Sequence, residues 1–410
     1  MHTRLFTRNF LFLLLGQAFS LIGNYTLKFA LSMYVLEQTG SAGVFGGMLA
    51  VAAVPTVVLS PLGGVLADRI NRRTMMVVLD TISGGAVGIT FLLLGRVEWF
   101  ILIAGLQIVL GILGAFESPT VQACIPQMHS GDNLLRANAM VNQIQAVAAL
   151  VTSFAGSLLY TAWGIRPVLA VVSLCFFGTA LLECFLVLPT PTGQKNNGAM
   201  QIIKKDLTKS VQFLRVERPE VLHLLWLATL ANFLAAGCVT MGVPYMVRTA
   251  LGLSATWYGV AESLLGAAAV LSGLAVNFWG NRWQGRRMSG LLAGFGWSLL
   301  PVAAVFLLGV TPTVAYLVLV AAMGIGQILC GIFSILGLCL IQQRTPQELT
   351  GKVMAFVMSI SLCAQPLGQL LYGVAFDVAP VWLILTVTGI VMIVVAFSAW
   401  DFFAQLTGSW

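Results

Sequence analysis

The sequence predicts an all-α polytopic membrane protein, with twelve transmembrane helices in two six-helix bundles. Hydrophobic residues make up 59% of the 410 residues and charged residues only 9%. Mean hydropathy is +0.94, and apolar runs of about 20 residues, enough to cross a bilayer, recur along the whole chain. The runs are apolar on all sides instead of alternating with polar residues, which favours helices over the strands of a barrel.

The apolar runs define the expected spans and their order. They cover residues 9–36, 42–67, 75–95, 99–123, 136–162, 165–189, 219–248, 254–279, 288–309, 312–341, 350–376 and 380–404. This predicts an N-terminal six-helix bundle over 1–189, a cytoplasmic linker over 190–218 and a C-terminal six-helix bundle over 219–410. The linker is the only long polar stretch, and its basic middle is typical of an amphipathic helix on an anionic membrane surface.

The distribution of basic residues predicts the orientation. With the N-terminus inside, 17 of the 21 Lys and Arg residues fall in cytoplasmic segments and three in outer loops. This bias follows the positive-inside rule, so we expect both termini in the cytoplasm and a multi-pass location in a bacterial inner (plasma) membrane. The formal net charge of +7 does not indicate nucleic-acid binding, because the basic residues lie in short loops between spans.

No pattern in the chain indicates an enzyme, a cofactor or a metal site. The seven cysteines include no Cys-x-x-Cys pair, and the three histidines are scattered. They are most simply free thiols and isolated imidazoles in apolar segments. No Gly-rich phosphate loop precedes a helix, and no soluble domain is present to bind ATP, so a primary pump is not expected.

The loop between the second and third spans carries the strongest motif. Its sequence is Gly64-Val65-Leu66-Ala67-Asp68-Arg69-Ile70-Asn71-Arg72-Arg73. It resembles the signature of the major facilitator superfamily, G-x-L-A-D-[RK]-x-G-[RK]-[RK]. A related basic loop, Gly285-Arg286-Arg287-Met288, follows in the second half but lacks the acidic residue. Two halves related by an axis along the membrane normal fit this repeat.

The resemblance implies a cytoplasmic latch between the two bundles. Its expected residues are Gly64, Asp68, Arg69, Arg72, Arg73 and Asp80. Asp80 matches an acidic position of the exporter group, and it is close enough along the chain to pair with the loop arginines. Asn71 stands where the family has glycine, and we interpret it as a residue that tolerates a left-handed backbone.

Two further stretches resemble bacterial exporters of the macrolide-efflux and enterobactin-exporter type. They are Pro119–Pro126 with Arg136-Ala137-Asn138, and Gln365-Pro366-Leu367-Gly368. The resemblance implies a secondary exporter of drug-like or amphiphilic small molecules that works by alternating access. Proton coupling stays open, because residues 149–156 of span five contain one glycine and no proline, whereas such exporters often have a Gly- and Pro-rich antiporter pattern there.

Charged side chains inside spans are candidates for substrate or ion binding, because burying a charge in a bilayer is costly. Lys28 continues a polar face formed by Gln17, Ser20 and Asn24. Glu262 lies at a similar depth, and we expect it to pair with Lys28 as an outer gate. Glu117 in span four is the first candidate for a cation or proton site, and Glu183 is interpreted as an interfacial residue.

The complete set of candidate substrate- or ion-binding residues is Gln17, Asn24, Lys28, Glu117, Asn142, Asn232, Glu262, Gln327 and Gln365. Each polar residue singly is explained as well by hydrogen bonding between helices, and Lys28 by snorkelling to the interface. The expected partners are an amphiphilic small molecule, membrane lipids and, where transport is coupled, protons; we expect a monomer.

Two other functions remain open at this point. One is a lipid or lysophospholipid flippase of the same fold, which needs a greasy cavity open to the bilayer. The other is a non-transporting membrane scaffold or immunity protein. A scaffold has no use for the polar face of the first span, so that face favours a transporter.

Overall fold

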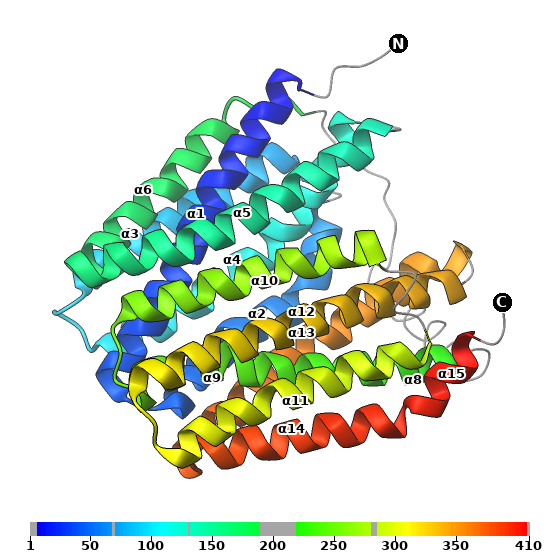
Figure 1. Cartoon of the computed structure of the whole chain (residues 1–410). Helices are drawn as coiled ribbons and strands as arrows, with labels where there is room; N and C mark the ends of the chain where they lie inside the picture. The colour runs from blue at the N-terminus through cyan, green and yellow to red at the C-terminus, as the bar shows by residue number, and fades with distance from the viewer. Residues whose placement is uncertain are drawn as a thin grey trace. The chain divides into compact units, whose positions relative to one another are not determined.

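The computed structural model describes residues 6–67, 70–129, 132–188, 219–279, 285–345 and 347–407, and these are almost entirely helical (Figure 1). The first half contains α1 (Arg8–Thr39), α2 (Ala42–Ala67), α3 (Arg72–Leu93), α4 (Trp99–Met128), α5 (Asp132–Trp163) and α6 (Ile165–Glu183). The second half contains α8 (Pro219–Ala235), η2 (Ala236–Met241), α9 (Gly242–Tyr245), η3 (Met246–Ala250), α10 (Ala255–Trp279), α11 (Arg286–Leu308), α12 (Pro312–Arg344), α13 (Gln347–Val378), α14 (Val381–Ser398) and α15 (Trp400–Thr407).

Eleven segments within the described residues are long and apolar enough to cross a membrane. The remaining predicted span, 350–376, corresponds to α13. The predicted linker, 190–218, and its expected amphipathic helix lie outside the described residues. The only β contact in the described ranges is an isolated bridge between Leu94 and Val97, in a tight connection.

Helix α6 ends at Glu183, six residues before the predicted end of its span. The following segment leaves the helix because Asn9 of α1 holds it: the Asn9 amide donates to the Val187 carbonyl (2.7 Å) and accepts from the Val187 amide (3.3 Å). Leu186 and Leu188 then insert into an apolar cluster that includes Phe10 and Met76. Tertiary contacts thus end this helix before Pro189 is reached.

The seventh span is not a uniform α-helix. It runs from Pro219 to Ala250, but Ala236–Met241 and Met246–Ala250 form π-helices. Pro244 lies between them and has no amide hydrogen, so a carbonyl of the preceding turn loses its donor. Short π-helical segments inside α-helices occur often at functional sites, and here the first one borders the pocket described below.

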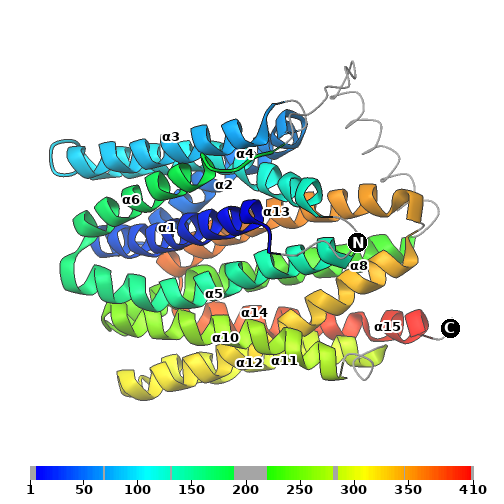
Figure 2. The same ribbon diagram turned by 90° about the horizontal axis from the view of Figure 1, so that it is seen from above.

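The chain forms two compact units. Unit 1 comprises 1–39, 48–197 and 255–263, and unit 2 comprises 40–47, 198–254 and 264–410. The start of α2 therefore groups with the second half, and the start of α10 with the first. In unit 1, α1 packs against α5 and α6, and α3 packs against α4 and α6; in unit 2, α11 packs against α12 and α14 (Figures 1 and 2).

Glycines let α2 and α4 of unit 1 approach each other to backbone contact. A Cβ added to Gly63 would lie 2.2 Å from the Ala115 carbonyl oxygen, and one added to Gly111 would lie 2.2 Å from the Ala52 carbonyl oxygen. Small residues have this role in membrane helices because the bilayer supplies no hydrophobic force between helices. Gly63 therefore permits the close packing of α2 against α4.

We expect Gly63→Ala to destabilise unit 1 by roughly 1–3 kcal/mol, the usual cost of overpacking, because the new methyl group meets backbone that cannot rotate away. Gly114→Ala is the matched control, since nothing lies within 4 Å of a Cβ at this position of α4. Thermal unfolding of the purified protein, followed by size-exclusion chromatography, measures both. Equal melting temperatures for the two variants would contradict the packing argument.

Candidate functional site

The polar face of α1 connects to α4 through hydrogen bonds within unit 1. The Ser20 hydroxyl donates to Oε1 of Glu117 (3.0 Å), and the Asn24 amide donates to the Ser20 oxygen (3.4 Å). Gln17 lies one turn before Ser20 on the same face and is 6% exposed, but its Nε2 has no hydrogen-bond partner in the structure. Three predicted residues, Gln17, Asn24 and Glu117, are thus gathered on one face.

Glu117 itself is half-buried and accepts a hydrogen bond from Ser20. A hydroxyl that donates to one carboxyl oxygen leaves the other oxygen able to accept from a ligand. The geometry therefore suits a group that recognises an ammonium or another hydrogen-bond donor.

Glu183 differs from its sequence interpretation, and Asp80 lies beside it. Both side chains are only 1% exposed, and their carboxyl groups lie close enough to interact with each other across α3 and α6. Glu183 is therefore buried and not interfacial, because α6 ends inside the helix packing and not at the membrane surface. Neither oxygen of Asp80 receives a hydrogen bond from an arginine in the described part of the chain.

The arginines of the motif loop bind backbone carbonyls of unit 1. Arg72 donates to the Ala123 carbonyl of α4 (2.9 Å), and Arg73 donates to the Cys184 carbonyl just after α6. The guanidinium group of Arg73 thus lies at the C-terminal end of α6, where positive charge is favourable. Of the other expected latch residues, Gly64 lies in α2, whereas Asp68 and Arg69 lie outside the described residues.

Asn71 is a helix cap and does not have a left-handed backbone, contrary to its interpretation from the sequence. Its φ is −60°, and its side chain accepts hydrogen bonds from the amides of Arg73 (3.0 Å) and Thr74 (3.4 Å). Asparagine is among the best residues at this position because its side-chain oxygen satisfies free amides of the first turn. The departure from the family glycine therefore reflects capping.

Lys28 and Glu262 both belong to unit 1 in the structure. Glu262 is hydrogen-bonded to the Tyr258 side chain, and the positive charge of Lys28 acts on the Glu262 carboxyl group. Tyr258 in turn stacks on Phe29, with ring centroids 5.1 Å apart. Oε2 of Glu262 is buried and has no hydrogen-bond partner in the structure. This oxygen can therefore still accept a hydrogen bond, and the positive charge of Lys28 acts on the same carboxyl group.

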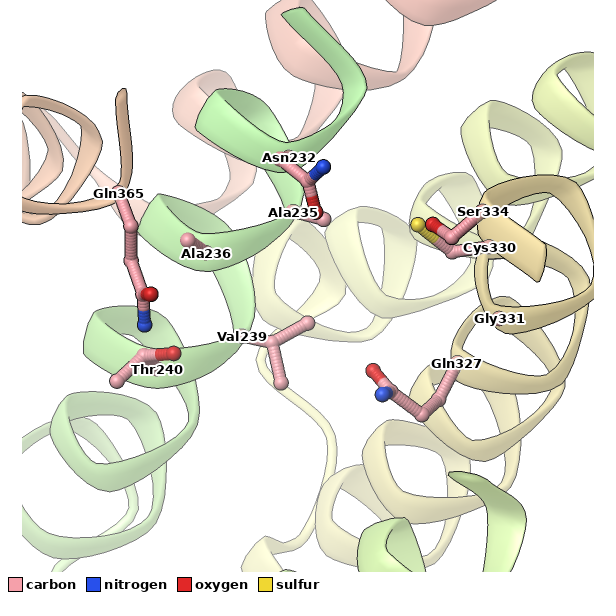
Figure 3. Close-up of a pocket in the computed structure, with 10 residues that line it drawn as sticks. All are labelled: Asn232, Ala235, Ala236, Val239, Thr240, Gln327, Cys330, Gly331, Ser334 and Gln365. Atoms are coloured by element: carbon pink, nitrogen blue, oxygen red, sulfur yellow. The ribbon is translucent and has the colours of Figure 1, made fainter. Parts of the chain in front are cut away.

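A pocket of about 400 Å³ lies within unit 2 (Figure 3). Its lining residues are Asn232, Ala235, Ala236, Val239, Thr240, Gln327, Cys330, Gly331, Ser334 and Gln365. Gln327 and Ser334 of α12 point toward the helix that carries Asn232 and Val239, and Gln365 of α13 lies beside Thr240 (Figure 3). The three amides predicted from separate spans are therefore brought together.

Among the described residues that line the pocket, the Cys330 thiol is the only ionisable side chain. Amides and hydroxyls both donate and accept hydrogen bonds, and Ala235, Ala236 and Val239 add apolar surface. This combination suits an amphiphilic molecule with hydroxyl, ether, ester or amide groups. Asn142, the remaining predicted residue, has a side chain outside the described residues, although its backbone belongs to α5.

Sequence reasoning missed Asp377, which fastens the start of α2 in unit 2. Its carboxylate accepts from the amides of Ala42 (2.8 Å) and Gly43 (2.9 Å) and from the Ser41 hydroxyl. A Cβ at Gly43 would lie 2.5 Å from an Asp377 oxygen, so glycine is required for this approach. The sequence held one signal for this contact: the first turn of α2 has no acidic residue of its own. A helix N-terminus favours a nearby negative charge, so an acidic residue from elsewhere in the chain could have been expected there.

Comparisons with known proteins agree with this architecture. The family model described as Major Facilitator Superfamily matches residues 13–361. Macrolide efflux protein A of Streptococcus pyogenes is 24% identical over 396 residues, which cover 93% of each chain. Multidrug resistance protein MdtG of Escherichia coli is 29% identical over 287 residues, covering 66% of this chain and 64% of MdtG.

A solved structure shows the same fold at lower sequence similarity. The nucleoside transporter NupG superposes with a TM-score of 0.77 at 12% identity, covering 96% of this chain and 99% of NupG. The all-α membrane fold and the family predicted from the motif loop are thus confirmed. The chain belongs to the Major Facilitator Superfamily and is a membrane transporter, not an enzyme.

Proposed function

We propose that this chain is a secondary exporter that moves drug-like or amphiphilic small molecules out of a bacterial cell by alternating access. The observation that carries the proposal is the polar, uncharged pocket of unit 2, where Asn232, Gln327 and Gln365 converge. Its volume of about 400 Å³ lies in the range of small-molecule sites, roughly 300–1,000 Å³. Two relatives, named as macrolide and multidrug efflux proteins, support the direction and the substrate class.

In this proposal the amides of the unit 2 pocket bind neutral polar groups of the substrate. Glu117 is proposed to recognise a cationic group. The proposed contact residues are those predicted from the sequence: Gln17, Asn24, Lys28, Glu117, Asn142, Asn232, Glu262, Gln327 and Gln365. The charge distribution supports an inner-membrane location with both termini in the cytoplasm, and we propose the chain as a monomer coupled to protons.

The latch remains part of the proposal. Gly64, Asp68, Arg69, Arg72, Arg73 and Asp80 are its residues by resemblance. The contacts of Arg72 and Arg73 with carbonyls of α4 and α6 support a role in holding the start of α3. Asp68→Asn tests the latch directly, because the substitution keeps the shape of the side chain and removes its charge.

Expression in a pump-deficient bacterial host is expected to lower the accumulation of a cationic dye such as ethidium, and an uncoupler is expected to restore it. Asp68→Asn is expected to abolish most of this efflux. Dye accumulation equal to that of cells with empty vector would contradict the exporter proposal. The non-transporting membrane scaffold would then be the remaining explanation. Transbilayer movement of a fluorescent lysolipid, without dye efflux, would support the flippase instead.

Glu117→Gln is expected to reduce efflux of cationic substrates about tenfold or more, because a hydrogen bond to a charged group contributes roughly 1.5–3 kcal/mol. Efflux of an uncharged substrate of similar size is expected to change little. Dye efflux and minimum inhibitory concentrations measure both. An equal loss for charged and uncharged substrates would remove Glu117 from cation recognition.

Cys330 lines the pocket, so substrate binding is expected to slow its reaction with a maleimide. The experiment uses a variant whose only cysteine is Cys330, with and without a transported macrolide. A second variant retaining only Cys339, which is exposed on the same helix, is the control and should react at the same rate throughout. If saturating substrate left the rate of reaction of Cys330 with the maleimide unchanged, the substrate would bind elsewhere.

The proposed gate is tested by charge exchange between Lys28 and Glu262. Lys28→Glu and Glu262→Lys are each expected to impair efflux, since each puts two like charges together. The double variant restores opposite charges, so efflux should recover at least in part. A double variant no more active than either single variant would show that the two residues do not act as a pair.

A further inference from the structure

The carboxyl groups of Asp80 and Glu183 form a buried contact that the proposed transport site does not use. Asp80 projects from α3 and Glu183 from the last turn of α6, and each side chain is 99% buried. The two carboxyl groups lie within interaction distance of each other. Neither oxygen of Asp80 nor Oε2 of Glu183 receives a hydrogen bond in the structure.

Two ionised carboxylates cannot make this contact. A carboxylate only accepts hydrogen bonds, so a hydrogen bond between two carboxyl groups requires a proton on one of them. Coulomb repulsion between two negative charges at such a distance is strong away from water. Buried acid pairs in enzymes share one proton for the same reason.

Within the described part of the chain, no arginine or histidine donates a hydrogen bond to Asp80 or to Oε2 of Glu183. Arg72 and Arg73 direct guanidinium nitrogens to the carbonyls of Ala123 and Cys184. His129, beyond the end of α4, packs edge to face on Phe10, and burial lowers the pKa of His129, so its imidazole is neutral near pH 7. No group of side chains suited to hold a metal ion occurs in the described residues.

Among the described side chains of the adjoining helices, none donates a hydrogen bond to Asp80 or to Oε2 of Glu183. On α4, Glu117 adds a third carboxyl group to the field of the pair, and Cys124 packs on Met76 with its Sγ 3.6 Å from the Met76 Sδ. On α1, the charge of Lys28 acts on Glu262. On α5, Tyr160 donates to Glu37, and the side chains of Asp132 and Arg136 lie outside the described residues.

A second, independent feature of the site is a spare hydrogen-bond donor on α1. A Cβ at Gly16 would lie 3.6 Å from Glu183 Cγ and 3.9 Å from Glu183 Oε1, so the α1 backbone rests against this side chain. Ser20, one turn further, donates to Glu117. Gln17 lies between these two contacts in sequence, is 94% buried, and has an Nε2 without an acceptor.

We propose that Asp80 and Glu183 form a proton-binding site of unit 1, which holds one shared proton in this conformation and releases it during the transport cycle. The proton passes to bulk water, and the pair gains one negative charge. Gln17 then supplies a hydrogen bond to the newly ionised carboxylate. Glu117 is left to recognise the substrate cation, so proton and substrate have separate carboxyl groups. The coupling step rests on the exporter function proposed above, whereas the proton site itself does not.

Infrared difference spectroscopy of the purified protein tests the proton site without transport. Near neutral pH the wild type is expected to show the carbonyl band of a protonated carboxyl group, shifted by deuterium exchange. Asp80→Asn/Glu183→Gln should lose this band, and Glu117→Gln and Glu262→Gln should keep it. A band of full intensity in the double variant, or no band in the wild type, would overturn the assignment. Size-exclusion profiles confirm that each variant is folded.

Reconstituted vesicles with ethidium test the coupling. The wild type is expected to accumulate ethidium under an imposed pH gradient and to exchange it without one. In the double variant, the ratio of gradient-driven accumulation to exchange without a gradient should fall at least tenfold below the wild-type ratio, whatever the absolute rate of exchange. Gradient-driven accumulation at the wild-type level in the double variant would refute coupling through this pair. If the wild type does neither, the exporter proposal fails for this dye while the infrared result still decides the proton site.

Discussion

The cost of an unpaired charge inside a bilayer is the constraint on which the polar interior of this protein depends. Three acidic side chains inside the spans of unit 1 reduce this cost through different contacts. Glu117 accepts from Ser20, Glu262 contacts Tyr258 and feels Lys28, and Asp80 shares its contact with Glu183. The contact between Asp80 and Glu183 requires a proton on one of the two carboxyl groups. Of these three arrangements it is therefore the one most sensitive to pH.

Close helix packing makes these contacts possible. Without a hydrophobic force between membrane helices, approach to backbone distance depends on small residues. Gly63 and Gly111 bring α2 against α4, and Gly16 exposes the α1 backbone to Glu183. In unit 2, a Cβ at Gly237 would lie 2.2 Å from the Tyr372 ring, so the π-helical segment beside the pocket also depends on a glycine.

Much of the architecture was predictable because it follows from local rules. Helix lengths follow from bilayer thickness, and the polar face of α1 follows from helical period, which placed Gln17, Ser20 and Asn24 together. The convergence of Asn232, Gln327 and Gln365 was expected only as a set of separate polar residues. Their common pocket depends on how α8, α12 and α13 pack, which no local pattern contains.

By itself, the sequence determined the membrane fold, the number and order of the spans, and the family, since hydropathy and the motif loop are local in the chain. Only the tertiary structure decided which polar groups meet. Asp80 and Glu183 are far apart in the sequence, and so are Asp377 and the start of α2. Both contacts arise where one helix ends beside another, because helix ends present free backbone groups and irregular chain that sequence periodicity does not describe.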